Sequence, residues 1–232
     1  MNVVPDDWSD RHKKLNEIIR KEGHFNEAIE MILDLHKQLH TAKVGELEAK
    51  NIIDALWENL KQNEYAIMPT SKDETIAWAI WHIARIEDLT MNILVDNSDQ
   101  VFDDSWKERM NISKSDTGNA MTDDEVLSFS KQVRIDELLK YRDTVGIKSR
   151  EIVKKLKSPD MKRRISPDGT SRILREGGVT EQADSTWLLD FWGKKDVAGI
   201  ILMPLTRHQT LHLNDCYKWK NIIRTKSKFF AV

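Results

Sequence analysis

The sequence contains little cysteine, glycine or proline, and it has no long hydrophobic run. The single cysteine, Cys216, excludes an intramolecular disulfide and fits a reducing compartment. No stretch approaches the roughly 18 consecutive apolar residues of a membrane-spanning helix, and the first residues lack the apolar core of a secretion signal. We therefore predict a cytoplasmic protein that does not enter a membrane.

Charge of neither sign is in clear excess. The chain has 36 Lys and Arg against 38 Asp and Glu, and its net charge of −2 makes a nucleic-acid partner unlikely on physical grounds. One local exception is the segment 154–175, which holds eight Lys or Arg against two Asp. We interpret this segment as a solvated surface loop, because most charge runs are of that kind.

Helical periodicity runs through most of the chain. Only 9 Gly and 5 Pro interrupt the 232 residues, and the two-residue alternation of strands is rare. This pattern predicts an all-α fold: a four-helix bundle with a long crossover connection and additional short helices. We expect one domain over residues 1–232, with a core of about 26–224 and an N-terminal extension at 1–25.

Short polar motifs predict several helix boundaries. Ser71 followed by Glu74 has the spacing of a capping box and predicts a helix over about 71–95. Thr122 and Glu125 predict a second capped start by the same spacing. Between these helices, a stretch rich in Asp, Asn and Ser predicts the crossover, with one helical turn near its middle.

Glycine and proline mark the remaining interruptions. Two Ser-Pro pairs and a Gly-Gly pair predict a loop or short irregular strands over 157–181. Gly45 divides the apolar run 26–60, which fits one long helix or two shorter ones. Pro204 predicts either a kink or a late start within the last helix, about 196–223.

Two pairs of histidines have the spacing of metal ligands. His208 and His212, in TRHQTLHLND, lie four residues apart and project from one face of a helix. His36 and His40 have the same spacing and remain an alternative pair. A third ligand is available in His82 of WHIARIE, which lies on an apolar helix face. Three imidazoles would leave a coordination position open for water or substrate, as in catalytic metal sites.

The order of these motifs resembles the DinB/YfiT-like superfamily of metalloenzymes, over about residues 26–224. The resemblance implies a divalent ion, zinc or nickel, held by His82, His208 and His212. It also implies a small-molecule substrate, with either transfer of a low-molecular-weight thiol or metal-dependent hydrolysis as the reaction. Gln209 stands where the HExxH motif requires glutamate, so a protease of that type is not expected.

Three charged side chains near the motifs are weaker candidates for catalysis. Asp215 lies close enough along its helix to orient an imidazole. Arg85 is placed to pair with a substrate carboxylate, although an ordinary ion pair with Asp88 or another exposed acid is the simpler explanation. Glu87 is a candidate for orienting the substrate. The thiol of Cys216 fits a small buried group better than a reactive one.

Other features fit more than one interpretation. Four of the eight tryptophans, Trp78, Trp81, Trp187 and Trp192, suit the wall of an apolar pocket, the core or a dimer contact. The alternative to an enzyme is a non-catalytic binding or assembly module whose metal site is structural or vestigial. A homodimer is plausible for either, because bundle proteins associate through exposed helix faces. His12 and His24 are expected on solvated faces.

Overall fold

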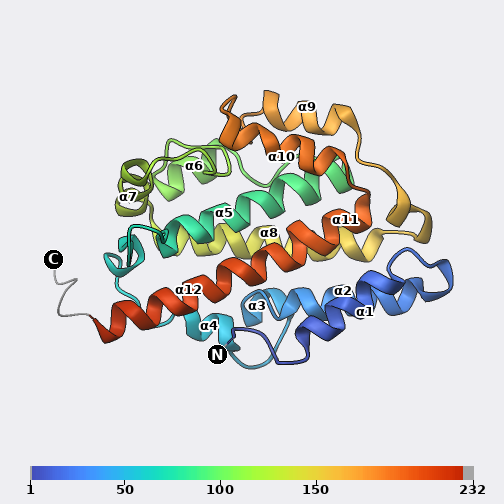
Figure 1. Cartoon of the computed structure of the whole chain (residues 1–232), viewed down its shortest axis with the longest axis horizontal. Coiled ribbons are helices and arrows are strands. Elements are labelled where there is room, and N and C mark those ends of the chain that lie inside the picture. The colour runs from blue at the N-terminus through green and yellow to red at the C-terminus, as the bar shows by residue number, and fades with distance from the viewer. Residues whose placement is uncertain (1, 227–232) are drawn as a thin grey trace.

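The computed structural model describes residues 2–226, and these form helices without any β-strand (Figure 1). The α-helices are α1 (Trp8–Ile18), α2 (Phe25–Lys37), α3 (Ala42–Gly45), α4 (Ile52–Trp57), α5 (Ile76–Asp88), α6 (Asp104–Met110), α7 (Asp123–Gln132), α8 (Ile135–Lys155), α9 (Pro167–Arg175), α10 (Ala183–Gly193), α11 (Val197–Leu202) and α12 (His208–Thr225). Two π-helical segments, Leu89–Asp96 and Met203–Arg207, extend α5 and join α11 to α12. Three 3-10 turns span Glu22–His24, Glu64–Ala66 and Ser158–Lys162. The predicted all-α class is confirmed over this part of the chain.

The centre of the molecule is α5, which packs between α8 and α12. All residues of α5 are buried, so this helix is covered on every side. α1 and α2 pack together at one edge, and α9 and α10 pack together at the opposite edge (Figure 1). None of the described helices combines the length and apolar character that crossing a bilayer requires.

The start of α5 differs from the prediction. Thr75 is the N-cap: its Oγ1 accepts a hydrogen bond from the Trp78 backbone N–H at 3.1 Å. Ser71 instead lies in the preceding turn, and Glu74 lies in the irregular residues between that turn and the helix. The predicted capping box is therefore wrong here, whereas the box of Thr122 and Glu125 at the start of α7 is confirmed.

The path from α11 to α12 contains the interruption predicted at Pro204. This proline lies in the π-helical segment between the two α-helices. Proline has no N–H to donate and its ring crowds the preceding turn, so the wider π turn accommodates it. The helical path continues beyond it, and α12 begins at His208.

Segment 157–181 contains α9, so the prediction of a loop or strands is wrong. Ser166 caps this helix through its Oγ, and Pro167 occupies the first turn. A Ser-Pro pair has this function at many helix starts, because proline at that position loses no helical hydrogen bond.

Run 26–60 is neither of the two helical arrangements that its pattern allowed. It divides into α2, the short α3 and α4, and Glu46 ends α3 with a left-handed φ of 55°. The chain therefore changes direction directly after Gly45, and the capped start of α4 follows at Asn51.

Candidate metal centre

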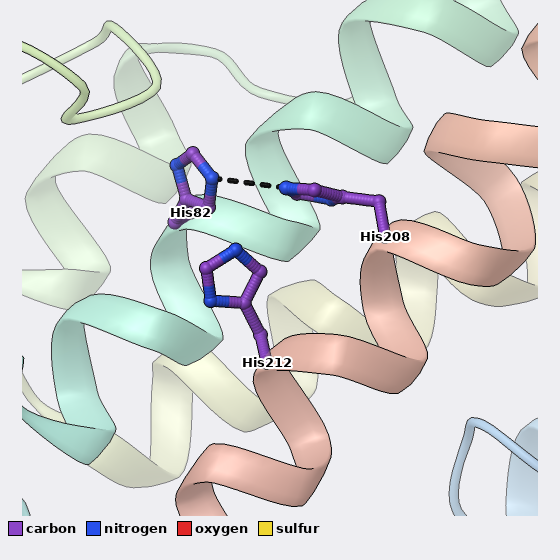
Figure 2. Close-up of side chains that lie close together, drawn as sticks. All are labelled: His82, His208 and His212. Atoms are coloured by element: carbon purple, nitrogen blue, oxygen red, sulfur yellow. Dashed lines mark hydrogen bonds between the residues drawn. The ribbon is translucent and has the colours of Figure 1, made fainter.

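Three histidines from two helices converge beside α5 (Figure 2). His82 projects from α5, and His208 and His212 project from successive turns of α12. The Nε2 atoms of His82 and His208 are 3.1 Å apart, and one nitrogen of each ring lies within 4.8 Å of the others. The three ring centroids are separated by 4.7 to 5.0 Å. The group can therefore hold one metal ion with all three imidazoles.

Neighbouring groups fix the ring of His82. Its Nδ1 lies 2.8 Å from the carbonyl oxygen of Thr117, and the indole of Trp78 stacks on it at 4.5 Å and 10°. A carbonyl only accepts, so Nδ1 carries the proton and Nε2 presents its lone pair to the other two rings. Metal-ligating histidines commonly have such an acceptor behind them, and His82 therefore fits a metal ion.

The three rings are uncharged at neutral pH. Burial lowers the pKa of His208 to about 3, with a further contribution from His212. Burial also lowers the pKa of His212 to about 4. For His82, burial and the two neighbouring imidazoles hold the pKa well below its ordinary value. Because only a neutral imidazole binds a metal ion, the site is prepared for ligation without loss of protons.

A short segment of the crossover covers one side of α5. Three consecutive carbonyl oxygens, of residues 116 to 118, accept hydrogen bonds from Trp81 Nε1, His82 Nδ1 and Trp78 Nε1 at 2.8 to 3.1 Å. Gly118 has a φ of +78°, and a Cβ there would lie 2.8 Å from the Trp78 Nε1 atom. Glycine is thus required at this position by both backbone conformation and close approach.

A cavity of about 330 Å³ opens beside the histidines. Its walls come from α5, α10, the crossover and the π-helical segment before α12. The residues that line it, besides the three histidines, are Trp78, Ile86, Asn119, Trp187, Leu188, Phe191, Trp192, Met203 and Pro204. A substrate in this cavity would lie directly against the candidate ligands.

The second histidine pair forms a separate buried group with Glu87. His36 Nε2 and His40 Nε2 lie 2.9 and 3.1 Å from the two carboxylate oxygens of Glu87, and Gln209 Nε2 donates to the same carboxylate. Burial lowers the pKa of His40 to about 3. Burial alone would raise the pKa of Glu87, but the imidazoles of His40 and His36 hold it well below its usual range.

By ligand type and distance this second group could also hold an ion. Its hydrogen bonds, however, already account for its geometry. Both Nε2 atoms donate to the carboxylate of Glu87, so these hydrogen bonds occupy the atoms that would face an ion. Arg142 lies nearby and donates to Gln209 Oε1 at 3.1 Å, which places a positive charge beside the carboxylate. We therefore interpret the group as a polar network that joins α2, α5, α8 and α12.

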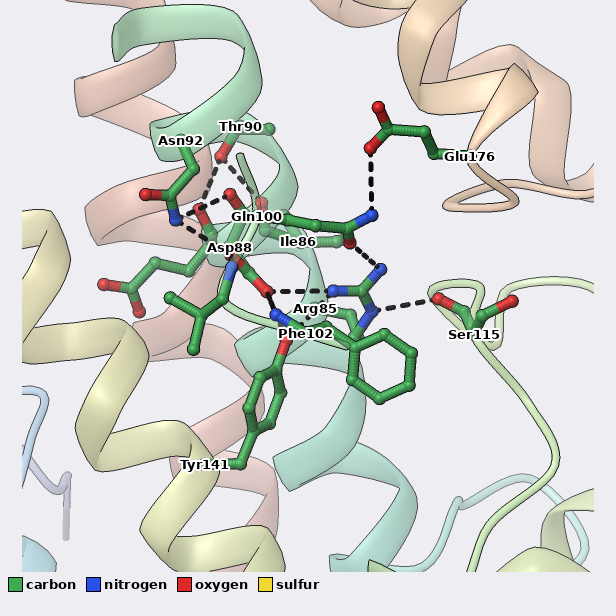
Figure 3. Close-up of polar contacts among 12 residues, drawn as sticks. Arg85, Ile86, Asp88, Thr90, Asn92, Gln100, Phe102, Ser115, Tyr141 and Glu176 are labelled. Atoms are coloured by element: carbon green, nitrogen blue, oxygen red, sulfur yellow. Dashed lines mark hydrogen bonds and ion pairs between the residues drawn. The ribbon is translucent and has the colours of Figure 1, made fainter. Parts of the chain in front are cut away.

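Arg85 and Glu87 do not reach the candidate metal centre. Arg85 is fully buried and pairs with Asp88 at 3.0 Å (Figure 3). Its other donors bond to Tyr141, Gln100 and the backbone of residue 115. The simpler alternative for Arg85, an ion pair with Asp88, is the one observed, although this pair is buried.

Asp215 and Cys216 also lie outside the group. The hydrogen bonds of His82 and His208 are made to Thr117 and to each other, so Asp215 orients neither ring. Burial raises the pKa of Asp215. Cys216 is buried, and burial raises the pKa of its thiol, which does not suit a nucleophile.

The tryptophans divide between the cavity and the core. Trp78, Trp187 and Trp192 line the cavity. Trp81 instead packs against Phe102, Phe129 and Tyr141 in the core.

The remaining two histidines, His12 and His24, are not part of either histidine group. His24 is exposed and pairs with Glu27, as expected of a solvated face. His12 is half-buried, with its Nε2 within 2.9 and 3.0 Å of the Leu202 carbonyl and the Thr206 hydroxyl, so the solvated face expected for it is wrong.

Comparison with known families agrees with this arrangement. A sequence model of the DinB superfamily matches residues 48–215. The chain belongs to the DinB superfamily. The part of this DinB protein that matches contains His82, His208 and His212. A search among curated proteins found no match.

Several contributors to the site of this DinB protein carry no signal in the sequence. The carbonyl of Thr117 is a backbone group, so residue type does not reveal it. Asn119, Phe191 and Met203 reach the cavity from three different segments. The Gly118 turn is the one local clue, because Thr-Gly-Asn is typical of a tight turn.

Proposed function

We propose that this protein is a metal-dependent enzyme that acts on a small molecule. The ion, zinc or nickel, would be held by His82, His208 and His212. The observation that carries the proposal is the convergence of three uncharged imidazoles at the wall of an apolar cavity. Imidazole ligation fits several divalent transition metals, and three protein ligands leave a position for a further molecule.

The surrounding residues would assist in distinct ways. An ion in such a site lowers the pKa of a bound water or thiol toward neutrality. Trp78 and the Thr117 carbonyl keep the His82 ring in its ligating orientation. Asn119 is positioned to hydrogen-bond a polar group of the substrate, and the aromatic wall excludes water from the reacting atoms.

Of the two reactions, we propose thiol transfer to an electrophile rather than hydrolysis. Hydrolysis of an amide or ester requires a group that protonates the leaving atom. Among the described residues, none of those that line the cavity is Asp, Glu, Lys, Arg or Tyr. When a thiol adds to an activated carbon–carbon double bond, the S–C bond forms as the π bond breaks, and the neighbouring carbon takes up the proton that the thiol gave up. No leaving group departs, so this reaction makes less demand on such a residue and is favoured.

His208→Ala tests the proposal, because it removes one ligand, and His208 is half-buried and lies outside the hydrophobic core. Protein purified without an affinity tag should contain close to one transition-metal ion per chain, and the variant should lose at least tenfold in ion affinity. A screen of electrophiles with several cellular thiols should give product only with the ion-loaded wild type. Elemental analysis and chromatography of the products are the measurements.

Two control variants make the result specific. His24→Ala removes an exposed histidine and should retain the ion. His36→Gln alters the second histidine group and should also retain it, since that group is not the proposed site. Retention of the ion in His208→Ala with loss in His36→Gln would contradict the assignment.

A further inference from the structure

We infer that the substrate bound beside the three histidines is small, uncharged and largely apolar, with one polar group directed at the histidines and Asn119. This inference rests on the proposed function, because the histidines form one wall of the cavity concerned. The inference specifies the chemical class of substrate that the site accepts. It also assigns substrate selection to residues of α10 and of the π-helical segment before α12.

The composition of the wall is the first argument. Of the side chains that line the cavity apart from the histidines, Asn119 is the polar amide, and the others are aromatic, aliphatic, Met or Pro. In the described part of the chain, Lys195 has its ammonium 4.2 Å from the Phe191 ring centre but is not among the lining residues. Among the described residues, the part of the wall away from the histidines therefore offers no charged partner to a carboxylate or ammonium group on the substrate.

The cost of desolvation makes a wall of this composition selective against charged substrates. An ionised group that leaves water for an apolar cavity loses its hydration, and without a partner this cost is several times that of an amide. An amide needs only hydrogen bonds, and the Nδ2 group of Asn119 is available to donate one, because its Oδ1 already accepts from the Thr117 hydroxyl at 2.7 Å. The cavity therefore discriminates against charge while it accepts one neutral polar group.

Size and shape narrow the class further. A volume of about 330 Å³ is at the small end of the roughly 300–1,000 Å³ typical of ligand cavities. Trp187 and Phe191 lie one turn apart on α10 with their rings 6.0 Å apart in an edge-to-face arrangement. Flat aromatic walls of this kind favour a ring or a branched chain of similar size.

The position of Trp187 indicates where the substrate enters. Its side chain is 49% exposed, although it lines the cavity, whereas Trp192 is 1% exposed. Trp187 therefore lies at the rim and Trp192 at the inner wall. Phe191 and Met203, which are both half-buried, lie between these two levels of exposure and are the residues we assign to substrate selection.

A matched pair of ligands tests the inference: indole-3-acetamide and indole-3-acetate, which have the same shape and differ in charge. Both are titrated by calorimetry at pH 7.5 into the full chain after its metal has been removed with a chelator. The amide should bind at least tenfold more tightly than the acetate. Phe191→Lys should bring a cation to the wall and reverse the order of affinities.

The control is Leu174→Lys, the same type of change on an exposed leucine of α9 outside the cavity, which should keep the wild-type ratio. Circular dichroism establishes that each variant is folded. Equal affinity of the wild type for both ligands, no binding of the amide at millimolar concentration, or an unchanged ratio in folded Phe191→Lys would each overturn the inference. These titrations use metal-free protein, so their results do not depend on metal binding. The metal content is measured on the same preparation before chelation, which keeps a failure of metal binding distinct from a failure of this inference.

Discussion

The carboxylate of Asp88 holds several segments together at one point. It accepts five hydrogen bonds: from Arg85, Asn92, Tyr141 and the backbone N–H groups of residues 101 and 102 (Figure 3). The ion pair with Arg85 is fully buried. The donors to the carboxylate come from α5, the π-helical segment that extends it, α8 and the start of the crossover. Removal of the carboxylate would leave the guanidinium charge of Arg85 buried without its counter-ion.

Asp88→Ala should therefore lower the free energy of unfolding by about 3–5 kcal/mol, the usual cost of breaking one half of a buried ion pair. Urea denaturation followed by circular dichroism measures this value. Asp99→Ala is the matched control, because Asp99 pairs with Arg172 while 96% exposed and its loss should cost less than about 1 kcal/mol. Similar losses in the two variants would show that the buried carboxylate has no special contribution.

At the scale of elements, two residues were candidates for the N-cap of α5, Thr75 and Ser71, and substitutions can distinguish between them. Thr75→Ala removes the hydrogen bond to the Trp78 N–H and the contact with Ser130, and should destabilise the protein by about 1–2 kcal/mol. Ser71→Ala should change stability by less than about 0.5 kcal/mol, since Ser71 lies in a surface turn. Thermal and urea unfolding of both variants give the comparison. A larger loss in Ser71→Ala would place the functional cap at the capping box seen in the sequence.

Long elements were predictable from the sequence, whereas their exact ends were less so. The helical pattern of α5 continues for several turns, and periodicity of that length leaves little ambiguity. At the start of α5, Ser71 and Thr75 both suit a cap, and tertiary contact with Ser130 favours the second. At the start of α9 the Ser-Pro motif was not sufficient, because Ser-Pro also occurs in turns and only packing against α10 distinguishes a turn from a helix start.

For the molecule as a whole, the buried imidazoles predict acid sensitivity. Burial lowers the pKa of His40 and His208 to about 3 and that of His212 to about 4, against about 6.5 in the unfolded chain. Between these values the unfolded chain binds more protons, so the stability present above pH 6.5 is lost as the pH falls toward 3. Each such imidazole should cost the folded state about 2 kcal/mol at pH 5.

Urea denaturation of metal-free protein at pH 7.5 and pH 5 measures this loss without interference from ligand binding. The loss of unfolding free energy between pH 7.5 and pH 5 should be smaller in His212→Gln, by about the contribution of one imidazole. His24→Gln replaces an exposed histidine and should leave the difference unchanged. A wild-type stability that is equal at both pH values would contradict the burial argument.

The candidate site was only partly visible in the sequence. The four-residue spacing of His208 and His212 on a helix is a local property, so it could be read directly. The approach of His82 depends on how α5 packs against α12. The apolar helix face made His82 a candidate third ligand, and the family resemblance strengthened that prediction. Glu87 lies on the same helix as His82 yet faces His36 and His40, because rotation about a buried helix decides which neighbour each side chain meets.

The run of three backbone oxygens over α5 has an evolutionary consequence. Since residues 116 and 117 contribute main-chain atoms to Trp81 and His82, their side chains can diverge among relatives while the anchorage of the imidazole persists. Only the glycine that follows is restricted, by its backbone angle and its proximity to Trp78. Exchange of crossover sequences between relatives would therefore preserve the His82 orientation as long as this turn is retained, and it would leave the neighbouring rim free to acquire new ligand preferences.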